Sequence, residues 1–96
     1  MKFLAYITLK KQPGPEVLSL IASELTHSQK LKRKGIIDNT WFEIDELGMP
    51  NGKRSWFLIN AENKEAVEEI LSDFPMYHHL DLEVDIKRVG VRWDDE

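Results

Sequence analysis

The sequence predicts an α+β fold in which one antiparallel sheet of four strands carries two helices on the same face. Two kinds of pattern lead to this prediction. Four segments alternate apolar and polar residues with a period of two, and two segments repeat apolar residues at helical spacing. Their order along the chain is β-α-β-β-α-β, which is typical of the ferredoxin-like arrangement. The chain has 96 residues, and we expect residues 1–96 to form a single domain.

The first three elements follow one another up to residue 45. Residues 2–10 alternate with apolar side chains on both faces, which favours a central strand covered on both sides. Residues 15–34 predict a helix, because a proline stands in its first turn and Gly35 is available as the C-cap. Residues 36–45 alternate again and predict the second strand.

A hairpin is predicted between the two middle strands. Residues 47–53 are rich in turn formers and contain Asn51-Gly52, a dipeptide typical of tight hairpin turns. We therefore expect the turn within this segment. The third strand is expected over residues 54–61.

The second helix and the last strand are separated by a proline. Asn63 is a suitable N-cap, and the helix must end near Asp73 because Pro75 has no amide hydrogen and a fixed φ. Residues 80–89 then alternate strictly between apolar and polar side chains. This pattern predicts a strand with one face on the core.

Alternation also assigns the strand side chains to two faces of the sheet. Those expected to point at the helices are Phe3, Ala5, Ile7, Leu9, Phe42, Ile44, Phe57, Ile59, Leu80, Leu82, Val84 and Ile86. Those expected on the opposite face are Leu4, Tyr6, Ile37, Trp41, Trp56 and Leu58, together with Asn39, Asn60, Asp81 and Glu83. The opposite face is too apolar to remain in water, which favours a second copy of the chain packed against it.

Charge and composition exclude several classes of partner. Thirteen basic and seventeen acidic residues give a net charge of −4, whereas a nucleic-acid site needs a clustered basic face. The basic cluster of residues 30–34 lies at a helix C-terminus, where cations complement the dipole. The absence of cysteine excludes disulfides and thiol chemistry, and no apolar run reaches bilayer length. We expect a cytoplasmic protein that binds neither nucleic acid nor a membrane.

Glu24 is the strongest catalytic candidate, because it falls within the predicted buried arc of the first helix. That arc is formed by Val17, Ile21, Ser28 and Leu31. Burial raises the pKa of a carboxylate toward the range of a general base. His27, at the border of the same arc, is a candidate to orient Glu24 or to bind an acidic ligand. The structural alternatives are a buried carboxylate paired with a core donor and a half-exposed histidine.

Aromatic and polar side chains supply the candidates for substrate binding. The predicted substrate-binding residues are Tyr6, Asn39, Trp41, Trp56, Tyr77 and His78. The two tryptophans and Tyr6 either stack on a ligand or fill the core of a dimer. His78 and His79 are adjacent in a predicted strand and therefore point to opposite faces, and no spacing matches a known metal site. We predict no metal and no cofactor.

Three segments together resemble the muconolactone delta-isomerase family. They are Gly35 with Trp41 six positions later, Ser55-Trp56-Phe57-Leu58-Ile59, and Phe74-Pro75-Met76-Tyr77 leading into Leu80-Asp81-Leu82-Glu83-Val84. The resemblance implies a dimeric α+β barrel, in some members a larger ring of dimers, with an active site in the cleft between sheet and helices. It also places Glu24 on a glutamate of the family's first helix. The Arg and His of the family's Trp-Arg-His-Leu-Trp run are absent, because residues 37–41 read Ile-Asp-Asn-Thr-Trp here.

The resemblance implies a reaction that moves a proton within a small unsaturated or cyclic organic acid or lactone, without a cofactor. An isomerase-like activity through Glu24 is therefore the first hypothesis. A cofactor-independent oxygenase or cyclase on the same barrel is the second, by analogy of fold alone. The third is a non-catalytic ligand-binding or assembly module, in which the aromatic residues fill the dimer interior.

Overall fold

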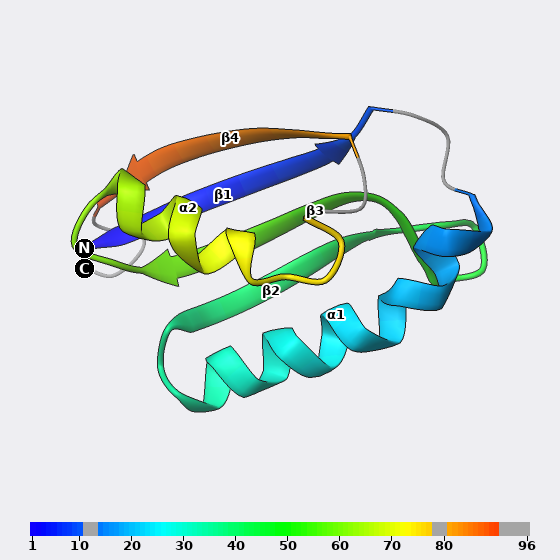
Figure 1. Cartoon of the computed structure of the whole chain (residues 1–96), viewed down its shortest axis with the longest axis horizontal. Coiled ribbons are helices and arrows are strands. Elements are labelled where there is room, and N and C mark those ends of the chain that lie inside the picture. The colour runs from blue at the N-terminus through cyan, green and yellow to red at the C-terminus, as the bar shows by residue number, and fades with distance from the viewer. Residues whose placement is uncertain (11–13, 78–80, 91–96) are drawn as a thin grey trace.

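The computed structural model describes residues 1–10, 14–77 and 81–90 and shows the predicted order of elements (Figure 1). Their bounds are β1 Lys2–Leu9, α1 Pro15–Arg33, β2 Ile37–Ile44, β3 Pro50–Asn60, α2 Lys64–Ser72 and β4 Leu82–Val89. The β-α-β-β-α-β prediction is confirmed. The predicted start of the last strand, Leu80, lies outside the described residues.

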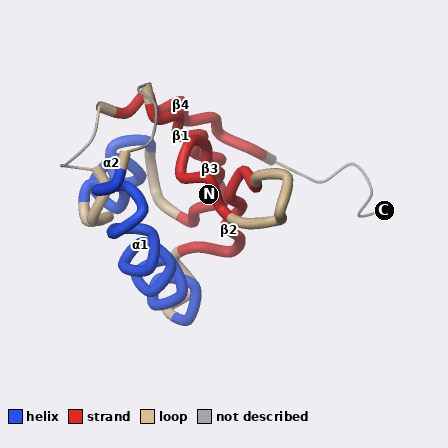
Figure 2. The backbone as a smooth tube through the Cα atoms, turned by 90° about the vertical axis from the view of Figure 1, so that its right-hand side faces the viewer, coloured by secondary structure: helices blue, strands red, loops and turns tan. Residues whose placement is uncertain are grey.

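The four strands form one antiparallel sheet in the order β2-β3-β1-β4. β1 is therefore a central strand, as predicted, with β3 on one side and β4 on the other. Both helices lie on the same side of this sheet, and the described residues place no helix on its other side (Figure 2). α1 packs on β2 and β3, whereas α2 packs on β1.

The hydrophobic core lies between the sheet and the helices. The buried core cluster consists of Phe3, Ala5, Leu31, Ile37, Phe57, Ile59, Val67, Leu71 and Phe74. Along β4 the helix-facing residues are half-buried and the alternate residues are exposed, which confirms the predicted alternation from Leu82 to Lys87. The sheet therefore has an apolar side under the helices that is distinct from its open side.

The ends of both helices follow the predicted signals. α1 ends at Arg33, and Gly35 then adopts φ +76°, a left-handed conformation that suits a residue without a side chain. At the start of α2 the Asn63 side chain accepts a hydrogen bond from the backbone N–H of Ala66 at 2.8 Å. α2 ends with Asp73 as its C-cap. The turn of residues 74–77 then leads away from α2 along the edge of the core.

The hairpin between β2 and β3 differs from the prediction. The turn lies at residues 45–49, where the Asp45 carboxylate accepts from the backbone N–H groups of Leu47 and Met49 and Gly48 adopts φ +80°. β3 already begins at Pro50, so Asn51-Gly52 is part of a strand and not of the turn. The aspartate-centred turn satisfies its own backbone donors, and the Asn-Gly signal instead coincides with a break in the β2–β3 ladder.

Two register shifts in the β2–β3 ladder overturn two face assignments. Ile37 pairs with Ile59 and Asn39 with Leu58, so one extra residue of β2 is accommodated between them. Ile37 is therefore buried under the helices, whereas simple alternation placed it on the open side. Ile44 was expected under the helices but is 60% exposed, because it follows the second shift, between Phe42 and Ile44.

The open side of the sheet carries the aromatic residues that alternation placed there. The rings of Tyr6 and Trp56 stack with centroids 5.0 Å apart and planes within 9°. Trp41 pairs with Trp56 across β2 and β3 and is 48% exposed, whereas Leu58 is half-buried. No helix in the described part of the chain is long and apolar enough to cross a membrane.

Candidate active-site cleft

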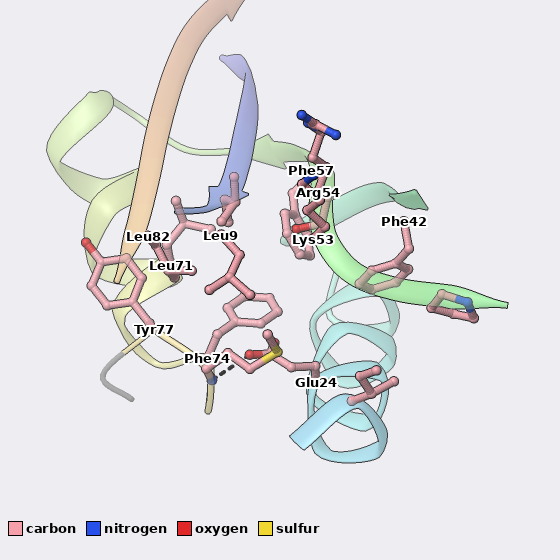
Figure 3. A pocket seen from close by; sticks show the side chains of 15 residues that line it. Leu9, Glu24, Phe42, Lys53, Arg54, Phe57, Leu71, Phe74, Tyr77 and Leu82 are labelled. Atoms are coloured by element: carbon pink, nitrogen blue, oxygen red, sulfur yellow. Dashed lines mark hydrogen bonds between the residues drawn. The ribbon is translucent and has the colours of Figure 1, made fainter. Parts of the chain in front are cut away.

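A cleft opens on the helix-covered side of the sheet, lined by side chains from both helices and all four strands (Figure 3). Its empty volume is about 600 Å³ with the open mouth included. Most of its wall is apolar, with Leu9 from β1, Phe42 from β2, Phe57 from β3 and Leu71 from α2 among the lining residues. A concave, mainly apolar site with a few polar groups is typical of sites for small molecules.

Glu24 contributes a carboxylate to this apolar wall. Helical spacing puts Glu24 on the same face of α1 as Ser28 and Leu31, which pack against the sheet. Glu24 is therefore buried and only 6% exposed. Burial raises the pKa of Glu24 from its ordinary value of 4.5 to about 7, and the hydrogen bond from Met76 opposes this shift. Near neutral pH the carboxylate therefore exists in both protonation states, as a group that accepts and returns a proton requires.

The turn after α2 holds the Glu24 carboxylate in place. The backbone N–H of Met76 donates a hydrogen bond of 2.6 Å to Glu24 Oε1, drawn as a dashed line in Figure 3. A backbone donor cannot rotate away as a side chain can, so this bond fixes the orientation of the carboxylate. One oxygen is occupied by the N–H, and the second oxygen has no hydrogen-bond partner recorded among the described residues.

A chain of aromatic rings forms the inner wall of the cleft. Phe74 packs on Phe57 with ring centroids 5.0 Å apart, and Phe57 packs edge-to-face on Phe42 at 6.2 Å. On its other side Phe74 meets the ring of His27 at 4.7 Å, also edge-to-face. The wall of aromatic rings therefore reaches from α1 across the turn to β2.

In the described part of the chain, no hydrogen bond joins His27 to Glu24. Its Nε2 is buried and has no hydrogen-bond partner among the described residues, and its ring packs on Phe74. Buried polar atoms of this kind are uncommon in folded proteins. The structure thus places His27 behind the aromatic wall, and its predicted catalytic role stays a prediction.

The β3 side of the cleft carries polar groups that the sequence patterns did not single out. Lys53, Arg54 and Ser55 all line the cleft. The Arg54 guanidinium donates to the Glu43 carboxylate at 2.9 Å, and this hydrogen bond raises the pKa of Arg54 above its ordinary value. The alternation of β3 could have indicated this, because Lys53 and Ser55 lie on the same face of the strand as the buried Phe57. In the sequence-based prediction, Lys53 was assigned to the turn instead.

The predicted substrate-binding residues do not all meet at this cleft. Tyr77 lines it, and Figure 3 shows its hydroxyl directed away from Glu24. Tyr6, Asn39, Trp41 and Trp56 belong to the open side of the sheet, across the strands from Glu24. His78 lies outside the described residues. The sheet therefore separates the aromatic group from the carboxylate that was expected to work beside it.

The described residues contain no group of three or more His, Asp or Glu side chains that is arranged to hold a metal ion. The chain has no cysteine to add to such a group. The prediction that the protein uses neither metal nor cofactor stays a prediction.

The fold and the cleft together define a class: a ferredoxin-like α+β protein with a buried carboxylate in an apolar cleft under its helices. The model of the muconolactone delta-isomerase family matches residues 1–86. The chain therefore belongs to the muconolactone delta-isomerase family, and the resemblance seen in the sequence is confirmed. No curated protein matches the chain in sequence.

Solved structures similar to this chain share its fold at low sequence identity. A 5-chloro-2-hydroxyhydroquinone dehydrochlorinase from Burkholderia phenoliruptrix AC1100, in complex with 2,5-dihydroxybenzoquinone, has 19% identity and a TM-score of 0.68 over 94% of each chain. A muconolactone isomerase has 23% identity and a TM-score of 0.62 over 100% of this chain and 98% of the other. A putative antibiotic biosynthesis monooxygenase from Deinococcus radiodurans has 14% identity and a TM-score of 0.54 over 100% and 99%. These structures show the fold, and membership of the muconolactone delta-isomerase family indicates an enzyme-like protein that acts on small molecules.

Proposed function

We propose that this protein is a cofactor-free isomerase that moves a proton within a small unsaturated or cyclic organic acid or lactone. Glu24 is the group that carries the proton. The observation behind the proposal is the position of this carboxylate, 6% exposed in an apolar cleft, with a pKa of about 7. Membership of the muconolactone delta-isomerase family supports the reaction class.

In the proposed reaction, one carboxyl group both removes the proton and returns it. The Glu24 carboxylate removes a proton from the carbon beyond the double bond that is conjugated with the carbonyl of the substrate, and the electron pair of that C–H bond passes into a dienolate. The Glu24 carboxylic acid then returns the proton to the carbon next to the carbonyl, so the double bond has moved. No oxidant, reductant or leaving group is involved, and the carboxylate is restored.

The surroundings of Glu24 favour both halves of this transfer. The apolar wall keeps the pKa close to neutral, and the Met76 N–H holds one oxygen so that the carboxylate keeps a constant orientation. A general base placed in this way typically contributes a factor of about 10²–10⁴ to the rate. The apolar wall of the cleft suits the apolar part of a small cyclic substrate.

The test is the conversion of muconolactone, followed by proton NMR in D₂O so that solvent deuterium entering the substrate is detected. We expect the wild-type protein to catalyse the shift and Glu24→Gln to lower the rate by a factor of about 10² or more. Glu46→Gln, which changes an exposed glutamate in the hairpin turn, serves as the matched control and keeps the full rate. A Glu24→Gln variant as active as the control contradicts the proposal.

We further propose that the open side of the sheet packs against a second copy of the chain. Exposed Trp41 beside the stacked pair of Tyr6 and Trp56 makes this side too apolar to remain in water, and the same flat surface on a second copy is its complement. A larger ring of dimers stays a prediction. The oxygenase or cyclase hypothesis has only the shared fold behind it, since a fold does not fix a reaction.

A further inference from the structure

One serine of the sheet lies in the floor of the cleft. Ser55 of β3 pairs with Ile7 of β1 on one side and with Phe42 of β2 on the other. Residues that pair directly across antiparallel strands project to the same face of the sheet, and all three of these residues line the cleft. The short Ser55 side chain therefore lies on the helix-covered face, between two apolar neighbours.

The Ser55 hydroxyl is unpaired and accessible. It has no hydrogen-bond partner among the described residues. It is not sealed within the core either, because His27 Nε2 is the only buried side-chain nitrogen or oxygen in the described part of the chain that lacks such a partner. The hydroxyl therefore opens into the cleft. A ligand that fills the cleft has to offer it an acceptor, because an unpaired polar group in apolar surroundings is costly.

The other polar side chains of the β3 wall and of the turn are engaged elsewhere. Lys53 and Tyr77 both line the cleft, and each interacts with other groups of the protein. The Arg54 guanidinium donates to the Glu43 carboxylate at 2.9 Å, and in Figure 3 its side chain extends away from Glu24. Among the described lining residues, the serine hydroxyl is therefore the side-chain donor that remains for a ligand.

The proposed proton transfer creates a charge that needs such a donor. When Glu24 removes the proton, the electron pair of the C–H bond passes into a dienolate, and negative charge develops on the carbonyl oxygen of the substrate. A hydrogen-bond donor fixed beside that oxygen stabilises the transition state more than the neutral substrate, and the apolar surroundings strengthen this interaction.

We propose that Ser55 is a second catalytic residue, whose hydroxyl donates a hydrogen bond to the carbonyl oxygen of the substrate while Glu24 moves the proton. This inference rests on the proposed function and deepens it, because it fixes the orientation of the substrate. The carbonyl oxygen lies against β3, and the carbons that lose and regain the proton face α1. Ser55 forms no covalent bond and keeps its own proton throughout.

The first test measures kcat and KM for muconolactone in three serine variants. Ser55→Ala removes the hydroxyl, and we expect kcat to fall by a factor of about ten to a hundred while KM changes less than about threefold, because the hydrogen bond strengthens as the charge develops. Ser55→Thr keeps a hydroxyl on the same carbon and is expected to restore kcat. Ser23→Ala makes the matched change on the exposed face of α1 and keeps the full kcat. A Ser55→Ala variant with the kcat of Ser23→Ala overturns the proposal.

The second test needs no turnover. It compares butenolide, the simplest unsaturated γ-lactone, with dihydrofuran, which has the same ring and double bond without the carbonyl oxygen. Binding of each probe is measured by NMR titration. We expect Ser55→Ala to weaken butenolide binding about threefold, as for loss of one hydrogen bond between neutral groups, and to leave dihydrofuran binding unchanged. Equal effects on the two probes, or wild-type protein that does not bind butenolide, overturn the proposal.

The failure of this proposal is distinguishable from the failure of the proposed function. If the wild-type protein does not convert muconolactone, the proposed function fails, and the two probes alone decide whether Ser55 binds a carbonyl oxygen. An active Glu24→Gln beside a slow Ser55→Ala contradicts the proton transfer alone. An inactive Glu24→Gln beside a fully active Ser55→Ala contradicts the role of Ser55 alone.

Discussion

The two sides of the sheet use similar residues for different purposes. Under the helices, Phe42, Phe57 and Phe74 line a cleft into which Glu24 brings the one buried carboxylate of the described residues. On the open side, Tyr6 and Trp56 stack on each other, and the neighbouring acidic residues of β4 are exposed. Aromatic residues are therefore no guide to the site by themselves, and the charged group that they surround distinguishes the two sides.

The comparison also separates catalysis from assembly. Exclusion of water raises the pKa of a carboxylate, and the helices exclude water from one side of the sheet. Within the residues that the structure describes, the open side has no helix above it, and we infer that another molecule covers its aromatic surface. The following predictions test this division, from the largest expected effect to the smallest.

Leu71→Ala and Leu58→Ala make the same change on the two sides of the sheet. Leu71 is 1% exposed in the core, so its truncation is expected to lower the free energy of unfolding by about 2–5 kcal/mol. Leu58 is half-buried on the open side, and we expect a cost of about 1 kcal/mol in dilute solution, where no second copy covers it. Urea denaturation measures both costs, and equal costs contradict the division.

Glu24→Gln is expected to alter how stability depends on pH. Since the folded-state pKa is raised from 4.5 to about 7, the folded protein binds this proton more tightly than the unfolded chain does. Stability from this group is therefore fully present below pH 4.5 and is lost as the pH rises to 7, by roughly 3 kcal/mol at most.

The glutamine variant carries no titrating group at this position, so it gains stability relative to wild-type protein between pH 4.5 and pH 7. Urea denaturation at pH 4.5 and pH 8 measures the difference, with Glu46→Gln as the control. Parallel pH profiles for all three proteins show that residue 24 is not desolvated.

Trp41→Ser tests what covers the open side. Trp41 is 48% exposed in the described chain, and we expect its loss to weaken the dimer by a factor of about ten or more in sedimentation equilibrium, as for truncated aromatic residues at interfaces. Leu47→Ser removes a side chain that is 87% exposed in the hairpin turn and leaves the dimer unchanged. A concentration of roughly 100 µM is well above typical dissociation constants of dimers. Wild-type protein that sediments as a monomer at this concentration refutes the proposal that a second copy covers the open side.

Ser28→Ala and Glu43→Gln compare a buried polar contact with a partly exposed one. The Ser28 hydroxyl of α1 is buried and shares a hydrogen bond of 2.9 Å with the Thr40 hydroxyl of β2, so its loss is expected to cost about 1 kcal/mol. The ion pair of Glu43 with Arg54 is partly exposed, and we expect its loss to change stability less than the loss of the Ser28 hydroxyl does. Thermal unfolding at low salt measures the loss of stability in both variants. A larger loss in Glu43→Gln than in Ser28→Ala contradicts the prediction.

Much of this fold follows from local patterns in the sequence. The alternation of residues 2–10, the helical spacing of residues 15–34 and the Asn63 cap each act within one element, and the structure agrees with them to within one or two residues. The inward position of Glu24 also follows from helical spacing alone. These features need no knowledge of what lies next to the element.

The errors arise where two elements meet. The register of β2 on β3 decides the face of Ile37 and Ile44, and a bulge that shifts this register leaves no clear mark in the sequence of either strand. The turn at Asp45 was missed because Asn51-Gly52 is the stronger dipeptide signal. Trp41 was grouped with Glu24 as part of one site, although alternation along the strand puts Trp41 on the side of the sheet away from α1. The alternation was the better guide to the position of this side chain.

The most direct test of the account is the titration of Glu24 itself, because it needs no knowledge of the substrate. The protein is labelled with carbon-13, and the side-chain carboxyl signal of Glu24 is assigned by its loss in Glu24→Gln. The NMR signal is then followed from roughly pH 3 to pH 9, a range that includes both ordinary and raised carboxyl pKa values. The account predicts a midpoint of about 7. A midpoint at the ordinary value of 4.5 contradicts it, because a carboxylate that titrates there is not held in an apolar cleft.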